Sequence, residues 1–141
     1  MNFIVPPSVA PGVQTDTVTA AGEAIAAGSL SISADGPGVF VLQPANPQQP
    51  GAIENQDYSV NGSSNPASAG SVIQIFATGY AASSPIQVLI GDAPAQVRYS
   101  GSVGPGLWQI DAVIPVGATG FYPVYIVANG IASNAATVAV H

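Results

Sequence analysis

Hydrophobic residues along this chain occur in short runs, many alternating with polar residues, and Gly, Pro or Asn punctuates the runs. A two-residue alternation places every second side chain on one face of a strand, so the pattern predicts β-strands. Expected strands cover residues 72–77, 86–90, 95–99, 107–114, 121–128 and 131–140, with short edge strands at 39–42 and 52–53. No window combines a 3.6-residue period with helix caps, since glycines interrupt the Ala-rich stretch at 20–27. We therefore expect an all-β fold, an antiparallel β-sandwich.

The chain contains an internal repeat, because residues 2–33 reappear loosely but in order as residues 111–140. The matched positions are Ile4-Val5-Pro6 with Val113-Ile114-Pro115 and, after a one-residue gap, Gly12 with Gly120, Gly22 with Gly130 and Ile32 with Val140. A repeat indicates a chain built of like modules. The first copy matches only the closing part of the second.

Two dipeptides predict hairpin turns at equivalent places in the two copies. Asn129-Gly130 is a strong signal for a two-residue turn between the last two strands. Its counterpart Ala21-Gly22 predicts a matching hairpin that joins residues 13–20 to residues 25–33.

The alternation also assigns side chains to faces. Trp108 and Ile110 fall on the inferred core face of their strand, so packing is the expected role of the single tryptophan. Phe121 and Tyr125 fall on the outer face of theirs, and exposed apolar side chains mark contact sites. These two residues form the candidate contact patch, for another protein, a further copy of this chain or an extracellular polysaccharide.

Residues 35–70 differ in composition from the rest of the chain, because they are rich in Pro, Gly and Asn. We expect residues 1–34 to be the closing half of a preceding repeat. Residues 35–70 should then be a linker with edge strands, and residues 71–141 the sandwich itself.

Composition excludes several classes of function. The chain has 48% apolar residues but only one Lys or Arg and seven Asp or Glu, which gives a net charge of −6. Nucleic-acid binding requires clustered cations, so it is not expected. No apolar run approaches the length of roughly 20 residues that a membrane span needs, so no membrane insertion is expected.

The residues that carry chemistry favour a non-catalytic protein without a cofactor. The chain has no Cys, and the single His141 stands at the last position, where a frayed terminus would make a poor general base. Glu54, Asn55, Asp57 and Asn61 bring four oxygen-bearing side chains together in one loop, which makes them a candidate calcium site. The spacing is not that of an EF-hand, and Asn and Asp are also ordinary turn residues.

An ordered series of short motifs runs through residues 36–141. It consists of Gly36-Pro37-Gly38-Val39-Phe40, Gly51-Ala52-Ile53, Asn55-Gln56-Asp57, Asn65-Pro66-Ala67, Gly70-Ser71-Val72, Ala77-Thr78-Gly79, Ile90-Gly91, Pro94-Ala95, Tyr99-Ser100-Gly101, Pro105 to Ile110 and Ala132-Ser133-Asn134. This series resembles an uncharacterised C-terminal repeat module of secreted acidobacterial proteins, first named from Solibacter, which is similar in turn to the IPT/TIG group of immunoglobulin-like domains. Asp92 departs from the family, whose turn more often reads Gly-Gly. The resemblance implies an immunoglobulin-like sandwich in a secreted or cell-surface protein, and it brings no catalytic residues.

Three functions remain open at this point. The first is a non-catalytic structural or adhesion module of a secreted or surface protein. The second is a self-assembling filament or matrix subunit in which residues 2–33 complete a neighbouring copy by strand pairing. The third is a carbohydrate-binding module. An enzyme is not expected.

Overall fold

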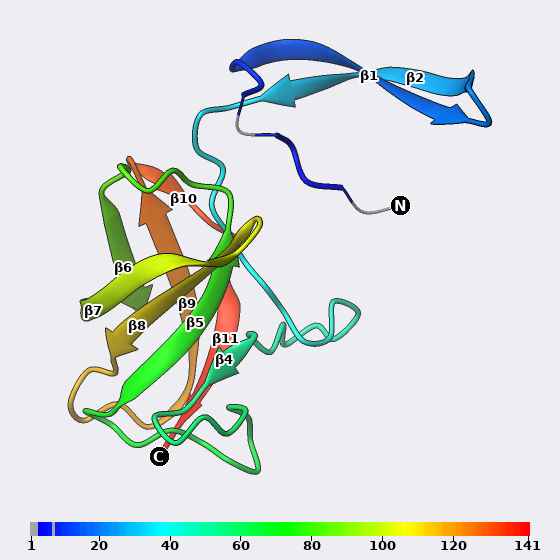
Figure 1. Cartoon of the computed structure of the whole chain (residues 1–141). Helices are drawn as coiled ribbons and strands as arrows, with labels where there is room; N and C mark the ends of the chain where they lie inside the picture. Colours follow the sequence, from blue (N-terminus) through cyan, green and yellow to red (C-terminus); the bar gives the residue numbers. More distant parts are fainter. Residues whose placement is uncertain (1–2, 7) are drawn as a thin grey trace. The chain divides into compact units, whose positions relative to one another are not determined.

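The computed structural model describes residues 3–6 and 8–141 (Figure 1). The described residues form strands and no helix, so the all-β prediction is confirmed. The chain divides into two compact units, Met1–Ala34 and Asp35–His141. Asn2, where the repeat begins, lies outside the described residues.

The first unit is a single hairpin. Strands β1 (Gly12–Ala20) and β2 (Glu23–Ile32) form a two-stranded antiparallel sheet. The turn is the predicted Ala21-Gly22, whose φ angles of 51° and 87° give the left-handed pair that a tight hairpin turn requires. Phe3–Pro6 precede the hairpin without regular structure.

The second unit is a curled, sandwich-like arrangement of antiparallel strands (Figure 1). Its strands are β3 (Gly38–Val39), β4 (Ile53–Glu54), β5 (Val72–Thr78), β6 (Ile86–Ile90), β7 (Ala93–Gly104), β8 (Leu107–Val113), β9 (Gly120–Ala128), β10 (Ile131–Ala132) and β11 (Ala136–Val140). The strand order is β10-β9-β6-β7-β8-β5-β3, with β11 beside β9 and β4 beside β5. β7 curls the sheet, because its first residues pair with β6 and the rest of it pairs with β8.

The core of the second unit lies between the strand faces that the alternation predicts. Ile110 and Ala112 of β8 and Val124 and Ile126 of β9 have no solvent exposure. Trp108 packs against this core and stacks at a tilt on Tyr80, with 4.7 Å between ring centroids. Burial raises the pKa of the Tyr80 hydroxyl.

Three predicted strands depart from the structure by more than two residues. β7 runs well past the expected residue 99, as a long arm paired with β8. The strand expected over 131–140 is split into β10 and β11 by residues 133–135, although Ser133 still donates its amide to the carbonyl of Ile126 on β9 (2.8 Å). The Asn134 side chain accepts a hydrogen bond from the amide of Val39 (2.9 Å) and donates one to its carbonyl (3.1 Å). It thereby anchors β3, which is shorter than the expected 39–42.

Residues 35–70 belong to the second unit, where they line the outer edge of β11. Thr137 donates its amide to the carbonyl of Gln49 and accepts from the amide of Gly51. Further along, Ala67 donates its amide to the carbonyl of Ala139 (2.9 Å). The wrapping segment therefore satisfies a strand edge that would otherwise be open.

Candidate functional site

The most informative site is the hairpin of the first unit, because it repeats the closing hairpin of the second unit residue by residue. A constant shift of 108 residues, from Gly12 to Gly120, superimposes the two registers. Cross-strand pairs of the first hairpin have counterparts in the second. Gly12–Ile32 matches Gly120–Val140, Gln14–Leu30 matches Tyr122–Val138, and Asp16–Gly28 matches Val124–Ala136. Beyond the register shift, Thr19–Ala24 matches Val127–Ala132, and Ala20–Glu23 matches Ala128–Ile131. The repeat therefore extends from sequence to strand pairing.

Backbone irregularities recur in the two hairpins as well. The turn residues Asn129 and Gly130 have φ angles of 49° and 82°, close to the values at Ala21 and Gly22. Gly12 and Gly120, which open the equivalent strands, also both have positive φ, 126° and 108°. The register shift between Val18 and Thr19 has its counterpart between Val124 and Val127. Such features are specified locally, so their recurrence marks two copies of one module element.

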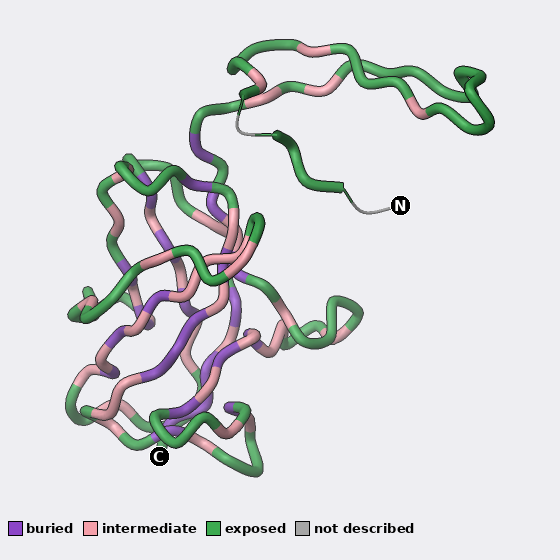
Figure 2. The backbone as a smooth tube through the Cα atoms, in the orientation of Figure 1, coloured by how far each residue is buried: buried purple, intermediate pink, exposed green. Residues whose placement is uncertain are grey.

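The two hairpins differ in burial. In the second unit the inward face is fully packed, and its residues are Val124, Ile126, Ala128, Ala136, Val138 and Val140. On the equivalent face of the first unit, Val18, Leu30 and Ile32 are only half-buried, and Asp16 is exposed. Figure 2 shows the contrast, with an almost wholly exposed hairpin and buried segments concentrated in the second unit.

The edges of the two hairpins differ in the same way. β9 pairs with β6 along one edge and with β10 and β11 along the other. Within the described part of the chain, β1 and β2 pair only with each other. An unpaired strand edge is a template for another strand, so this hairpin has the properties of a docking element.

The residues before the hairpin show the same lack of cover. Phe3, Ile4 and Val5 are 56%, 60% and 38% exposed. By the repeat, Val5 corresponds to Ile114, at the end of the β8 segment, which has no exposure. This short apolar run is therefore equivalent to a segment that packs in the complete unit.

The candidate contact patch is only partly exposed. Phe121 is 65% exposed, whereas Tyr125 is half-buried and lies opposite Leu89 on β6. Both side chains project from the outer face of β9, as the alternation predicts. The two residues are four positions apart on one strand, roughly 13 Å at about 3.3 Å per residue, so an exposed ring and a half-buried one offer two small, separate apolar contacts.

The candidate calcium loop is organised by its own hydrogen bonds. Asn61 is buried, donates to the carbonyl of Ala139 (2.9 Å) and accepts from the amide of Ala139 (2.8 Å). Asn61 also donates to Oδ1 of Asn55 (2.9 Å), and Asn55 donates to the carbonyl of Asn65. Both amide oxygens are thus engaged in holding the loop against β11, which is a structural role.

The carboxylates of that loop take different positions: Asp57 joins the amide network only through Ser59, whose hydroxyl accepts from Asn55 and Asn65. Asp57 is exposed and accepts hydrogen bonds from the hydroxyl and the amide of Ser59, which lower the pKa of its carboxyl. Glu54 lies in β4, opposite Gln74 of β5. No group of three or more His, Cys, Asp or Glu side chains suited to a metal occurs among the described residues.

His141 is held in place, so the expectation of a frayed terminus is wrong. Its Nδ1 lies 3.1 Å from the carbonyl of Pro66, its Nε2 lies 3.2 Å from the Ser68 hydroxyl, and its amide donates to Ala67. A serine and an imidazole therefore meet, but the imidazole is oriented by a backbone carbonyl. In a catalytic triad a carboxylate orients the imidazole, whereas here a carbonyl does. The contact therefore fits a structural role, in which His141 is held against Pro66 and Ser68.

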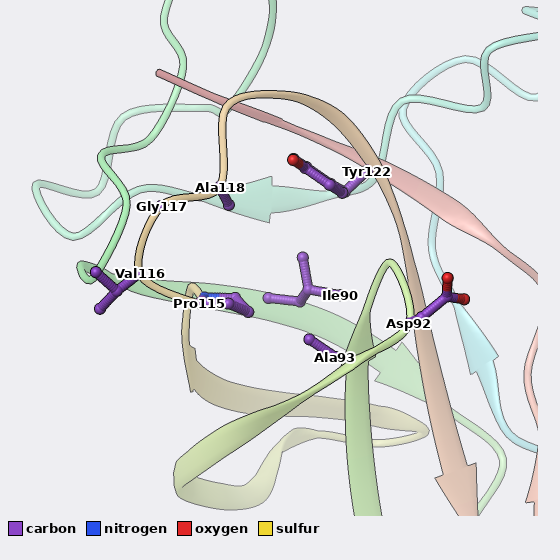
Figure 3. Close-up of a pocket in the computed structure, with 8 residues that line it drawn as sticks. All are labelled: Ile90, Asp92, Ala93, Pro115, Val116, Gly117, Ala118 and Tyr122. Carbon is purple, nitrogen blue, oxygen red and sulfur yellow. The ribbon is translucent and has the colours of Figure 1, made fainter.

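A hollow of about 430 Å³ lies beside the β6–β7 turn. Its lining residues are Ile90, Asp92, Ala93, Pro115, Val116, Gly117, Ala118 and Tyr122, with Asp92 and Val116 at opposite ends of the group in Figure 3. The lining is mainly apolar and carries one carboxylate. It contains no nucleophile paired with a base, so it does not resemble a catalytic site.

Sequence reasoning overlooked Asp16. It occupies the position of Val124, and Gly28 across the strand pair occupies that of Ala136. The signal was present in the repeat, because aligning Gly12 with Gly120 sets a carboxylate against a core valine.

No helix in the described part of the chain is both long and apolar enough to cross a bilayer. No protein-family model matches the chain, and a comparison with curated proteins finds no match. The function is therefore inferred from the geometry of the two hairpins and from the resemblance that the motifs carry.

Proposed function

We propose that this chain is part of a non-catalytic, immunoglobulin-like repeat protein of the IPT/TIG kind, secreted or displayed on the cell surface, in which each module acts as a structural or adhesion unit. The observation that carries the proposal is the duplicated register of residues 12–32 and 120–140. A hairpin with the turn, bulge and pairing of a module's closing strands is expected to close a module itself. The secreted or surface setting rests on the motif resemblance.

Support also comes from the exposure of apolar side chains in the first unit. Its half-buried Leu30 and Ile32 and the exposed Phe3 and Ile4 correspond to positions that contact the rest of the second unit. An isolated two-stranded hairpin is marginally stable in water at best. A front half equivalent to residues 35–110 would cover these residues and give the hairpin a core.

The test is to supply that front half. Residues 35–110 are placed ahead of the chain so that Asn2 follows Ile110, as the repeat aligns them, and Asp16→Val matches the core face to that of β9. We expect the amides of Thr17 and Thr19 to become protected from hydrogen exchange. By the equivalence with β9, these two amides point toward the place of β6 and away from β2.

The matched control carries Gly22→Val in the same extended protein. A β-branched residue at a φ of 87° is strained, so the hairpin should not form and the two threonine amides should stay unprotected. If Thr17 and Thr19 exchange equally fast with and without the added front half, the module proposal is wrong.

A second candidate is a self-assembling extracellular subunit, which the open edges of β1 and β2 favour. Only one of the chain's residues is Lys or Arg, so few side chains of the kind that block edge pairing are present. Light scattering after size exclusion, together with negative-stain microscopy, distinguishes the two candidates. Filaments support assembly, and a monomer at micromolar concentration rules it out.

A further inference from the structure

The complete unit shows what surrounds each position of the incomplete one. Val124 lies between Ile90 on β6 and Ala136 on β11, and all three side chains are essentially buried. By the constant register, Asp16 lies between Gly28 and whatever strand occupies the place of β6. The structure thus gives Gly28 as one neighbour of Asp16, and the repeat assigns the other side to a β6-like strand.

A carboxylate at this position is incompatible with an apolar neighbour. Burying an ionised group without a partner is strongly unfavourable, and so is leaving a buried charge without its partner. The front half of this chain would place Ile90 beside Asp16. It is therefore a poor acceptor for residues 12–32, whether it comes from the same chain or from a second copy.

The residue opposite Asp16 is altered together with it. Gly28 stands where the second unit has Ala136, so this position carries no Cβ. The pair Asp16–Gly28 thus offers a charge and, beside it, space for a longer side chain. A hydrogen-bond donor such as Gln or Arg uses both features.

We propose that residues 12–32 dock onto the front half of a different β-module, whose β6-like strand presents a hydrogen-bond donor side chain to Asp16. This inference rests on the proposed function and adds the identity of the partner. The donor satisfies the carboxylate that closure buries. The same carboxylate prevents the hairpin from replacing residues 120–140 in another copy of the chain, so modules pair in a set order.

The experiment uses the extended protein with its natural Asp16, and changes only the Ile90 of the added front half. We expect Ile90→Gln to slow exchange of the Thr17 and Thr19 amides by about a hundred-fold, the scale of an uncompensated buried carboxylate. With Asp16→Val also present, the same Ile90→Gln should instead speed exchange, because the glutamine then faces an apolar side chain. This reversal of sign is the signature of a specific contact.

Each outcome bears on one proposal. Equal protection with Ile90 and with Gln at that site, in the presence of Asp16, would overturn the donor requirement while leaving the module proposal intact. Lack of protection in every variant, including Asp16→Val with Ile90, would instead overturn the module proposal. Ile90→Gln in the chain's own second unit serves as the control, and there it should only destabilise the folded state.

Discussion

The two hairpins of this protein, Gly12–Ile32 and Gly120–Val140, share a turn, a bulge and a register, yet one lies within a packed unit, whereas the strands of the other pair, among the described residues, only with each other. Hairpin geometry is thus specified locally, by Gly at the turn and by the alternation of side chains. Burial is not, because it depends on residues far away in the chain. The comparison separates what a hairpin needs in order to form from what it needs in order to be stable.

The largest effect is expected from exchanging the residue that differs most. Val124→Asp places an unpaired carboxylate in the core and should lower the free energy of unfolding by about 4 kcal/mol or more, enough to unfold the second unit. The reciprocal Asp16→Val, at an exposed position, should change stability by less than about 0.5 kcal/mol. Urea unfolding followed by Trp108 fluorescence measures the first, and hydrogen exchange in the hairpin measures the second. Similar effects at the two sites would contradict the difference in burial.

A truncation at a purely apolar pair sharpens the same comparison. Ile126→Ala removes a side chain with no exposure and should cost about 3 kcal/mol. Its counterpart Val18→Ala, at a half-buried site, should cost about 0.5 kcal/mol. Denaturant midpoints of the two variants and the parent provide the measurement. A cost at Val18 as large as that at Ile126 would mean that the first hairpin is already packed.

The edge of β11 can be opened to resemble the edge of β2. Asn61→Ala leaves the amide and carbonyl of Ala139 without their side-chain partner and should cost about 2 kcal/mol. Asn65→Ala removes exposed hydrogen bonds in the same loop and serves as the control, with an expected cost of about 0.5 kcal/mol. Thermal melts rank the variants. Equal melting temperatures for Asn61→Ala and Asn65→Ala would show that Asn61 does not hold the loop against β11.

Acid should weaken the second unit through Asp35. Hydrogen bonds from the Ser84 hydroxyl, and from the amides of Ala81 and Asn129, lower the pKa of this buried carboxyl, although burial itself opposes the shift. A lowered pKa in the folded state stabilises the fold above the unfolded value near 3.9, and the contribution is lost as the pH falls through the lowered pKa. Melting temperature should therefore drop less steeply below about pH 4 in Asp35→Asn than in the parent. The same dependence of melting temperature on pH in Asp35→Asn and in the parent would show that Asp35 does not contribute to the loss of stability in acid.

The smallest effect is expected on the outer faces. Phe121→Ala and its counterpart Val13→Ala remove exposed side chains and should each change stability by less than about 0.5 kcal/mol. Phe121→Ala also tests the contact patch. Carbohydrate binding is favoured if polysaccharide affinity gels retard the parent and Val13→Ala but not Phe121→Ala. Equal mobility of the parent and both variants would exclude it.

Much of the fold was predictable because its signals are local. The turns at Ala21-Gly22 and Asn129-Gly130 and the core face containing Ile110 and Ala112 follow from dipeptide chemistry and two-residue alternation. The long arm of β7 was not predicted, since residues 100–104 lack an apolar alternation and are held by pairing with β8. At the break between β10 and β11, Asn134 bonds to Val39, 95 residues away, which no local pattern predicts.

The candidate sites show the same division. The sequence groups the oxygens of Asn55 and Asn61 in one candidate calcium loop, whereas in the folded chain the Asn55 oxygen accepts from the Asn61 side chain and the Asn61 oxygen accepts from the Ala139 amide. Outer-face placement of Phe121 and Tyr125 was predictable, but the half-burial of Tyr125 depends on its neighbour Leu89 across the sheet. Side-chain hydrogen bonds between distant segments leave no periodic trace in a sequence.

By itself, the sequence determined that this protein is all-β, that its turns lie at particular glycines and that residues 2–33 repeat residues 111–140, because each of these depends on neighbours within a few positions or on direct comparison of letters. Only the tertiary structure decided which copy of the hairpin is buried and that Val124, the counterpart of Asp16, is a core residue. Burial and strand pairing join residues that are distant in sequence, so they exist only once the chain is folded.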